Sequence, residues 1–239
     1  MLQTTSAVVL RTVKHTEKSS VLRAYTERFG LRSYMVRTGA KSGDRSAALQ
    51  PLSRIELVVP EAGEHELRTV REVRIERPYI RLREEPVRGV LLLFAQEVLN
   101  RTLREESADE RLYTFVQETL EDMDGGADIK HQPLRMLVGL MRHLGFFPQA
   151  PSEGEDRFDL REGCFFHGYP PHEFCMGTRT TALFAGLVRV EEAASITTGP
   201  ASDPTVRRRL LDELLLYYRL HVEGFGELRS LEVLRSVLE

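Results

Sequence analysis

The sequence has little cysteine, no tryptophan and no long apolar run. Its 239 residues include only two cysteines, Cys164 and Cys175, too few for the disulfide framework of a small secreted domain. The longest apolar run, Val90 to Ala95, falls well short of the roughly 18 residues that a membrane helix needs. Residues 1–20 lack the basic segment and long apolar core of a secretory signal. These absences predict a cytoplasmic protein.

Familiar catalytic motifs are also missing. The chain contains no Gly-x-x-x-x-Gly-Lys phosphate loop, no His-Glu-x-x-His and no Gly-x-Ser-x-Gly. The acidic pairs Glu105-Glu106 and Glu191-Glu192 fall on expected helix surfaces or ends, where solvated carboxylates are the simpler explanation. We therefore expect no enzymatic activity and assign no catalytic residue. Mg²⁺-dependent hydrolysis of DNA would contradict this expectation and point to a nuclease.

The basic residues gather at the front of the chain. Residues 1–83 carry 16 Lys and Arg against nine Asp and Glu, whereas the rest carries 17 against 27. A basic half and an acidic half indicate two parts with different partners. A basic surface raises the local concentration of polyanions such as DNA, although an excess of this size is also found on domains that bind no nucleic acid.

Short alternating segments fill the front third of the chain. Their β-branched and apolar residues alternate with polar ones, and Gly-containing turns separate them. The expected strands are 6–13, 20–26, 31–38, 52–60 and 65–75. Five short strands in about 80 residues predict an OB-fold, a five-stranded β-barrel.

Helical periodicity begins after Pro78. The expected helices are 86–104, 109–123, 132–144, 178–186, 203–220 and 227–238. Asp109 and Asp203 are the expected N-caps, and Gly145 the expected stop of the third helix. Residues at about 149–177 have no helical period and predict an irregular insertion or a short hairpin. The chain is therefore expected to be an α+β protein, with an OB-fold domain at 1–80 and a mainly α-helical domain at 81–239.

Four segments, in this order, resemble the RecO family of DNA repair proteins. They are Ala7–Leu57, with an apolar strand, a polar turn and a strand closing on Gly-Ala and a basic loop; Leu134–Gln149, ending in Leu-Gly-x-x-Pro; Phe158–Phe165, with Phe-Asp-x-x-x-Gly; and Tyr217–Leu234. The resemblance covers nearly the whole chain, and its motifs are structural rather than catalytic.

The resemblance implies a mediator of DNA repair and homologous recombination. Such proteins bind single- and double-stranded DNA, anneal complementary strands and, with RecR, help RecA replace single-strand-binding protein on DNA. They also contact the acidic tail of that single-strand-binding protein. A cytoplasmic protein of this kind would be associated with the nucleoid.

Within the expected barrel, basic residues on the first and third strands and their loops are the candidates for binding phosphate. Tyr34 is the candidate for stacking on a base, with a buried core position as the alternative. The candidate DNA-binding residues are Arg11, Lys14, Lys18, Tyr34, Arg37, Lys41 and Arg45.

Arg135 and Arg142 are candidates for holding the acidic tail. They lie seven residues apart, near one face of the expected helix at 132–144, beside Leu134, Leu137 and Met141. An acidic peptide with an apolar end favours a hydrophobic groove rimmed by arginine. Ordinary solvated arginines remain the alternative explanation.

The insertion carries residues that can ligate zinc. Some members of the resembled family have a four-cysteine zinc site there, and this chain has Cys164-x2-His167 and His172-x2-Cys175 instead. These are proper zinc ligands, but the gap of four residues between the pairs is short. We therefore interpret the cysteines as small buried hydrophobes and expect a degenerate, zinc-finger-like insertion without metal.

A second function stays open. The barrel could bind a protein partner, with its positive charge incidental, and the chain would then be an interaction scaffold that does not bind DNA. Titration of a fluorescent oligonucleotide at two salt concentrations separates the two functions, because binding to phosphate weakens steeply with salt.

Overall fold

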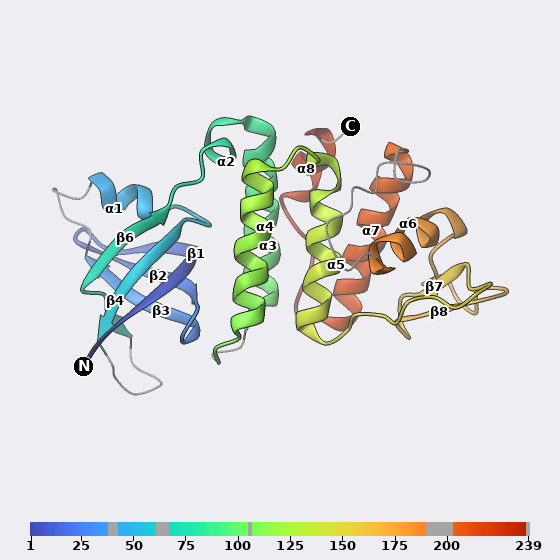
Figure 1. Cartoon of the computed structure of the whole chain (residues 1–239), viewed down its shortest axis with the longest axis horizontal. Coiled ribbons are helices and arrows are strands. Elements are labelled where there is room, and N and C mark those ends of the chain that lie inside the picture. The colour runs from blue at the N-terminus through green and yellow to red at the C-terminus, as the bar shows by residue number, and fades with distance from the viewer. Residues whose placement is uncertain (38–42, 61–66, 105–106, 190–202, 238–239) are drawn as a thin grey trace. The chain divides into compact units, whose positions relative to one another are not determined.

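The computed structural model describes residues 1–37, 43–60, 67–104, 107–189 and 203–237, with the backbone only for 43–45 and 237. The chain divides into two compact units, Met1–Gly125 and Gly126–Glu239 (Figure 1). The elements of the first unit are β1 Leu2–Thr16, β2 Ser19–Thr26, β3 Gly30–Arg37, α1 Gly43–Ala48, β4 Arg54–Pro60, β5 Arg68–Thr69, β6 Glu72–Arg77, α2 Arg81–Glu84, α3 Pro86–Thr102 and α4 Glu110–Gly125.

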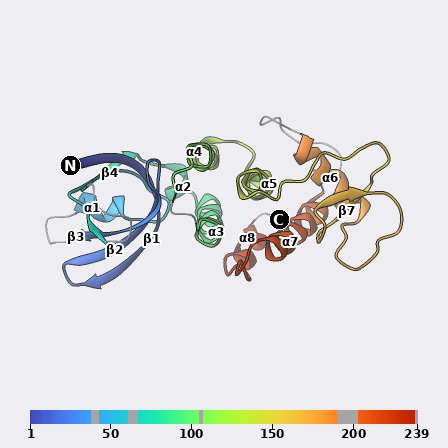
Figure 2. The same cartoon turned by 90° about the horizontal axis from the view of Figure 1, so that it is seen from below.

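The six strands form one curled sheet in the order β5-β3-β2-β1-β4-β6 (Figure 2). The last segment changes partner halfway: β5 runs parallel to β3, and β6 runs antiparallel to β4. At the change, the Val70 amide donates to the Met35 carbonyl and the Arg71 amide to the Val58 carbonyl, both at 2.9 Å. This segment joins the two edges of the sheet, as a closed OB-fold requires. The expected barrel is confirmed, with its fifth strand divided in two.

The alternation of the strands produces the core of the barrel. Inward-facing residues are buried because successive side chains of a strand point to opposite faces. The core comprises Ala7, Val9, Leu22, Ala24, Tyr34, Val36, Ala48, Leu49, Ile55, Leu57, Val59, Val70 and Val73, with Phe29 packed against it. Residues of β1 to β3 that alternate with these face outward, and they carry much of the basic charge of the barrel.

Helices α3 and α4 belong to the same compact unit as the barrel. Gln96 of α3 donates to the Leu10 carbonyl at 2.8 Å, and the Tyr25 hydroxyl donates to the Asp109 carbonyl, which precedes α4, at 3.3 Å. The change from strand to helix falls near residue 80, where composition predicts a domain boundary. The compact units divide later, after Gly125, because these contacts attach both helices to the sheet.

The second unit is mainly helical. Its elements are the 3-10 turn η1 Ile129–His131, α5 Gln132–Leu144, β7 Arg157–Asp159, β8 Cys164–Phe166, α6 Thr178–Arg189, α7 Pro204–His221 and α8 Leu231–Val237. Asp203 caps α7 by accepting from the Thr205 amide at 2.8 Å, and Gly145 ends α5 with a left-handed φ of 82°. The expected cap and stop are confirmed. None of the helices in the described part of the chain is long and apolar enough to cross a membrane.

The expected irregular insertion contains a small hairpin. β7 pairs with β8, and the following segment returns to the other side of β7. There the Leu160 amide donates to the Phe174 carbonyl at 2.9 Å and the Met176 amide to the Phe158 carbonyl at 2.8 Å. The hairpin alternative for 149–177 is therefore the one that the structure supports.

Candidate nucleic-acid interface

Five basic residues of the first three strands and the β1–β2 turn form what we call the β1–β3 cationic surface: Arg11, Lys14, Lys18, Arg23 and Arg37. Four are exposed and Arg23 is half-buried. None of these five side chains has a hydrogen-bond or ion-pair partner in the structure as described. Their charge is therefore available to an external anion.

The register of the strands places Arg11 and Arg23 side by side on the outer face of the sheet. Arg11 lies directly opposite Arg23 across β1 and β2, next to a bulge in β1. Arg37 lies opposite Ser19 on the same outer face, at the end of the sheet where Lys18 occupies the β1–β2 turn, whereas Lys14 lies opposite Ser20 and projects from the other face of that end. Like charges directly opposite one another destabilise a sheet, so an anion bound between Arg11 and Arg23 would relieve repulsion.

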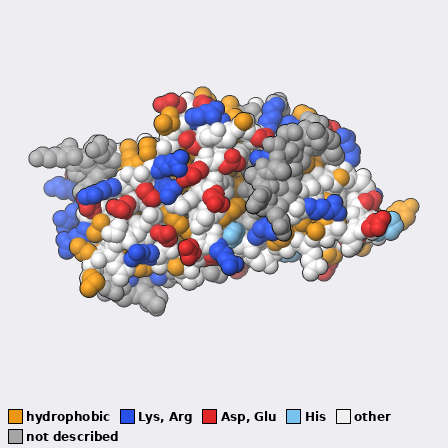
Figure 3. Space-filling model, in the orientation of Figure 1, with side chains coloured by type: hydrophobic (Ala, Val, Ile, Leu, Met, Phe, Trp, Pro, Cys, Tyr) orange, Lys and Arg blue, Asp and Glu red, His pale blue; other side chains and the backbone are white. Residues whose placement is uncertain are grey.

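The arginines within β4 and β6 are instead held by carboxylates. Arg54 contacts Glu76 at 2.9 Å and Glu121 at 2.7 Å. Arg77 also contacts Glu121, at 2.9 Å, and Arg74 contacts Glu72 at 2.7 Å. The hydrogen bond with Glu72 raises the pKa of Arg74 above its usual value. Blue side chains at the left edge of Figure 3 mark Lys and Arg on the barrel, and red carboxylates intermix with blue elsewhere.

The predicted DNA-binding residues differ in their exposure to solvent. Arg11, Lys14, Lys18 and Arg37 are exposed, as binding to phosphate requires. Lys41 lies outside the described residues, and Arg45 lies in α1 where only the backbone is described.

Tyr34 is a wrong prediction. Its side chain is fully buried in the barrel core, and burial raises its pKa. Because Tyr34 alternates with outward-facing Ser33 and Met35, the strand period places its ring inside. A ring in the core cannot stack on a base from solvent.

Arg23 was missed by the site prediction. The alternation in residues 20–26 placed Arg23 on the opposite side from Leu22 and Ala24, which was a usable signal. What the sequence did not supply was its position opposite Arg11, since that register depends on the bulge in β1.

Neither Arg135 nor Arg142 lines the groove that the structure shows in the second unit. Arg135 donates to Asp128 at 2.7 Å. Arg142 lies 3.8 Å above the ring of Phe147 and donates to the Val188 carbonyl. Both side chains are engaged within their own unit.

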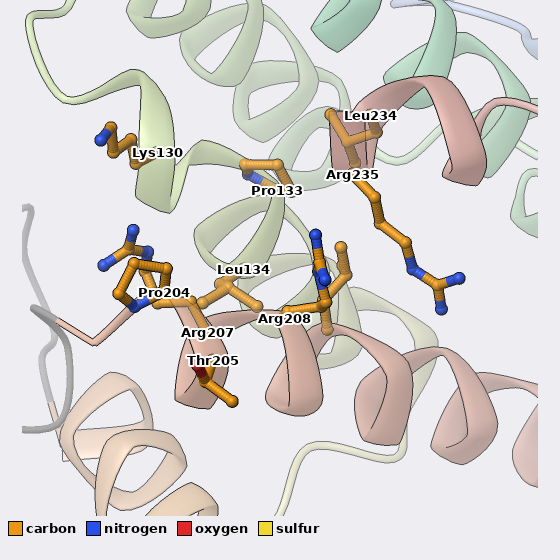
Figure 4. A pocket seen from close by; sticks show the side chains of 10 residues that line it. Lys130, Pro133, Leu134, Pro204, Thr205, Arg207, Arg208, Leu234 and Arg235 are labelled. Atoms are coloured by element: carbon orange, nitrogen blue, oxygen red, sulfur yellow. The ribbon is translucent and has the colours of Figure 1, made fainter. Parts of the chain in front are cut away.

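This groove has a volume of about 330 Å³. Its apolar lining comes from Pro133, Leu134, Leu211 and Leu234, and its basic lining from Lys130, Arg207, Arg208 and Arg235. Figure 4 shows how η1, α5, α7 and α8 contribute these side chains. The combination of apolar walls and basic groups suits an acidic peptide with an apolar end.

In the insertion, the four residues of the predicted zinc-like pattern do not stay together. Asp159, His172 and Cys175 form a cluster, whereas His167 is exposed. Partial desolvation of the sulfur, followed by the charges of Asp159, Glu162 and Glu155, raises the pKa of the Cys164 thiol. Cys164 is exposed, so the interpretation of both cysteines as buried hydrophobes is wrong.

Comparison with known proteins agrees with this architecture. The family model "Recombination protein O N terminal" matches residues 1–79, and "Recombination protein O C terminal" matches residues 83–232. The DNA repair protein RecO of Flavobacterium psychrophilum is 30% identical, over 98% of both chains. The proteins of the same name from Christiangramia forsetii and Bacteroides fragilis are each 28% identical, over 99% and 100% of both chains. This chain therefore belongs to the RecO family of DNA repair proteins.

Proposed function

We propose that this protein binds single- and double-stranded DNA through the β1–β3 cationic surface. The observation that carries the proposal is that five basic side chains on adjacent strands and the turn between them have no partner in the described structure. DNA carries one negative charge per about 1.7 Å of duplex axis, so it satisfies several such groups at once. The turn between the first two strands is a usual nucleic-acid contact of OB-folds.

Binding of this kind is directed at phosphate and therefore has little sequence preference. Each neutralised phosphate releases counterions, and the affinity falls steeply as salt is added. Tyr34 cannot add stacking on a base, because its ring is buried in the barrel core. Charge, rather than stacking on the predicted tyrosine, supplies the affinity.

Strand annealing follows from the same surface without catalytic chemistry. Two complementary strands repel one another, and a protein that screens their phosphates lets them approach and pair. With RecR, the protein would help load RecA onto DNA covered by single-strand-binding protein. It would act in the cytoplasm, associated with the nucleoid through its DNA.

The groove of the second unit would receive the acidic tail of single-strand-binding protein. Apolar residues such as Leu134 and Leu211 would hold the apolar end of the tail, and the exposed Lys130 would attract its acidic part. The groove replaces Arg135 and Arg142 as the proposed site, because neither side chain lines it.

Fluorescence anisotropy of a labelled acidic tail peptide tests the groove. Lys130→Glu should weaken binding at least tenfold, whereas Arg142→Ala should leave it unchanged. The reverse pattern would support Arg142 as a tail-binding residue and exclude the groove.

The DNA proposal is tested with a fluorescent single-stranded oligonucleotide at two salt concentrations, together with an annealing assay. We expect binding that weakens strongly at the higher salt and annealing that declines with it. Absent or salt-insensitive binding by the folded protein would favour the interaction scaffold.

A further inference from the structure

Strand β1 carries a bulge immediately before Arg11. Val9 lies opposite Ala24 in β2. The next pair joins Arg11 to Arg23, so that Leu10 is left out of the pairing. A bulge of this kind adds one residue to a strand, and a shift of one residue exchanges the two faces of the sheet. The bulge therefore determines on which face the side chains that follow it project.

In a regular strand, Arg11 would face the barrel core. Ala7 and Val9 are core residues, and Arg11 follows them at the same period of two. In the structure Arg11 is exposed instead. The next residue, Thr12, faces inward, where its hydroxyl donates to the Leu49 carbonyl at 2.9 Å. The bulge thus turns Arg11 away from the core and onto the β1–β3 cationic surface.

Two side-chain amides of α3 hold the bulge. Gln96 Nε2 donates to the Leu10 carbonyl at 2.8 Å, and Asn100 Nδ2 donates to the same oxygen at 3.1 Å. Asn100 Nδ2 also donates to the Gln96 carbonyl at 2.9 Å, which fixes the Asn100 amide. Leu10 is fully buried, and a buried carbonyl at a bulge needs partners outside the strand ladder. Gln96 and Asn100 supply them because residues four apart share one face of a helix.

The other edge of β1 is fixed at the same point. The Leu52 amide donates to the Val9 carbonyl at 2.6 Å, and the Val9 amide donates to the Ser53 carbonyl at 3.0 Å. Leu52 is fully buried and has a left-handed φ of 57°, which is uncommon for a leucine. Backbone strain of this kind persists only where the surroundings enforce it, and it gathers at functional sites. Three segments distant in sequence therefore cooperate to form the bulge.

We propose that Gln96 and Asn100 are positioning residues for DNA binding, because their amides fix the bulge that holds Arg11 beside Arg23 on the outer face of the sheet. The inference rests on the proposed binding of DNA phosphate by this arginine pair. Neither amide side chain needs to contact the DNA. Since α3 carries both amides, a displacement of this helix would change the direction of Arg11 and so the affinity for DNA.

A double-mutant cycle with a fluorescent single-stranded oligonucleotide tests the coupling. Gln96→Met and Asn100→Leu keep the bulk of each side chain and remove its donor. At low salt, Arg11→Ala should weaken binding about fivefold and reduce the slope of log affinity against log salt by about 0.7, as the loss of one phosphate contact requires. The Gln96→Met, Asn100→Leu double variant should reproduce both changes. Each single variant should weaken binding only about twofold, because the remaining amide still satisfies the Leu10 carbonyl.

In the Arg11→Ala background, the double variant should weaken binding by less than about 1.5-fold, because both changes act through one side chain. A full fivefold loss in that background would overturn the proposal. Thr102→Ala is the matched control. It removes a buried hydroxyl of the same helix, which donates to the Val98 carbonyl at 2.9 Å, and it should leave the affinity unchanged.

Backbone NOEs between residues 11 and 23 report the position of Arg11 without DNA. We expect them in the wild type and expect the double variant to lose them, whereas a folded double variant that keeps them would overturn the proposal. Arg11→Ala with wild-type affinity would instead contradict the proposed function at this residue, and the NOEs would still decide the positioning. If the double variant does not fold, Asn100→Leu alone enters the same cycle, and its twofold loss should vanish in the Arg11→Ala background.

Discussion

The two halves of the barrel sheet are both rich in basic residues, but their charges have different surroundings. On β1 to β3, Arg11 and Arg23 face each other with no carboxylate between them. On β4 and β6, Arg54 and Arg77 share Glu121, and Arg54 also holds Glu76. The difference shows that a formal count of charge overstates the attraction for an anionic ligand, because an arginine paired with a carboxylate attracts that ligand less strongly.

The largest expected effect comes from reversing charge on the β1–β3 cationic surface. Lys14→Glu, Lys18→Glu and Arg37→Glu together should weaken binding to a single-stranded oligonucleotide on the order of 100-fold, because phosphate contacts are lost and repulsion is added. Fluorescence anisotropy at low salt measures the change. Arg74→Glu and Arg77→Glu in β6, combined with Arg81→Glu in the following helix α2, change the net charge equally at arginines that are paired with carboxylates, and should cost less than tenfold in affinity. Equal losses in the two triple variants would remove the distinction between the halves.

The ion pairs of β4 and β6 should contribute to the stability of the fold rather than to DNA binding. Arg54→Ala leaves Glu76 and Glu121 without their partly buried partner, and we expect the free energy of unfolding to fall by about 2 kcal/mol. Urea denaturation measures this loss. The affinity for DNA should stay within twofold of the wild type at a temperature where the variant is folded; a large loss of affinity would place Arg54 at the DNA.

Releasing a paired arginine from its carboxylate should raise the affinity for DNA, by a smaller factor than the charge reversals lower it. Glu72→Gln removes the partner of Arg74, whose side chain is 65% exposed, and should tighten DNA binding about two- to threefold, in line with the modest strength of surface ion pairs. Glu118→Gln on α4 removes one negative charge from an exposed position and is the control. If both variants gain equally, only net charge matters and the pairing does not.

Tyr34 provides the smallest expected effect on DNA. Tyr34→Phe keeps the ring in the core and should leave the affinity for DNA unchanged, because neither the ring nor its hydroxyl has access to solvent. Tyr34→Ala should lower the free energy of unfolding by about 3–5 kcal/mol, because it empties a core position. Retained stability together with weakened DNA binding in Tyr34→Ala would show that the ring reaches the ligand.

The fold was largely predictable because local patterns agreed with it. Period-two alternation marked the strands, and Asp203 and Gly145 marked helix ends through their ordinary capping chemistry. Helix α1 was not expected, since Gly43, Asp44 and Ser46 are typical of a loop. Packing of Ala48 and Leu49 into the barrel core stabilises this helix, whose local helix propensity is low.

The sites were less predictable, because they depend on contacts between distant residues. Composition identified basic residues but could not separate free from paired ones: Arg54 meets Glu121 across 67 positions of sequence. In the insertion, a bridge between strands places Asp159 opposite Cys175, and its carboxylate lies 3.2 Å from His172, which a spacing rule for cysteine and histidine cannot anticipate.

The central claim is that the β1–β3 cationic surface supplies the charge that binds DNA. Its most direct test is the slope of log affinity against log salt for single-stranded DNA, measured for the wild type and for a variant in which all five of its basic residues are alanine. At about 0.7 per neutralised phosphate, we predict that the slope becomes shallower by about 3 to 4 in the variant. A variant that remains folded and keeps the wild-type slope would contradict the account.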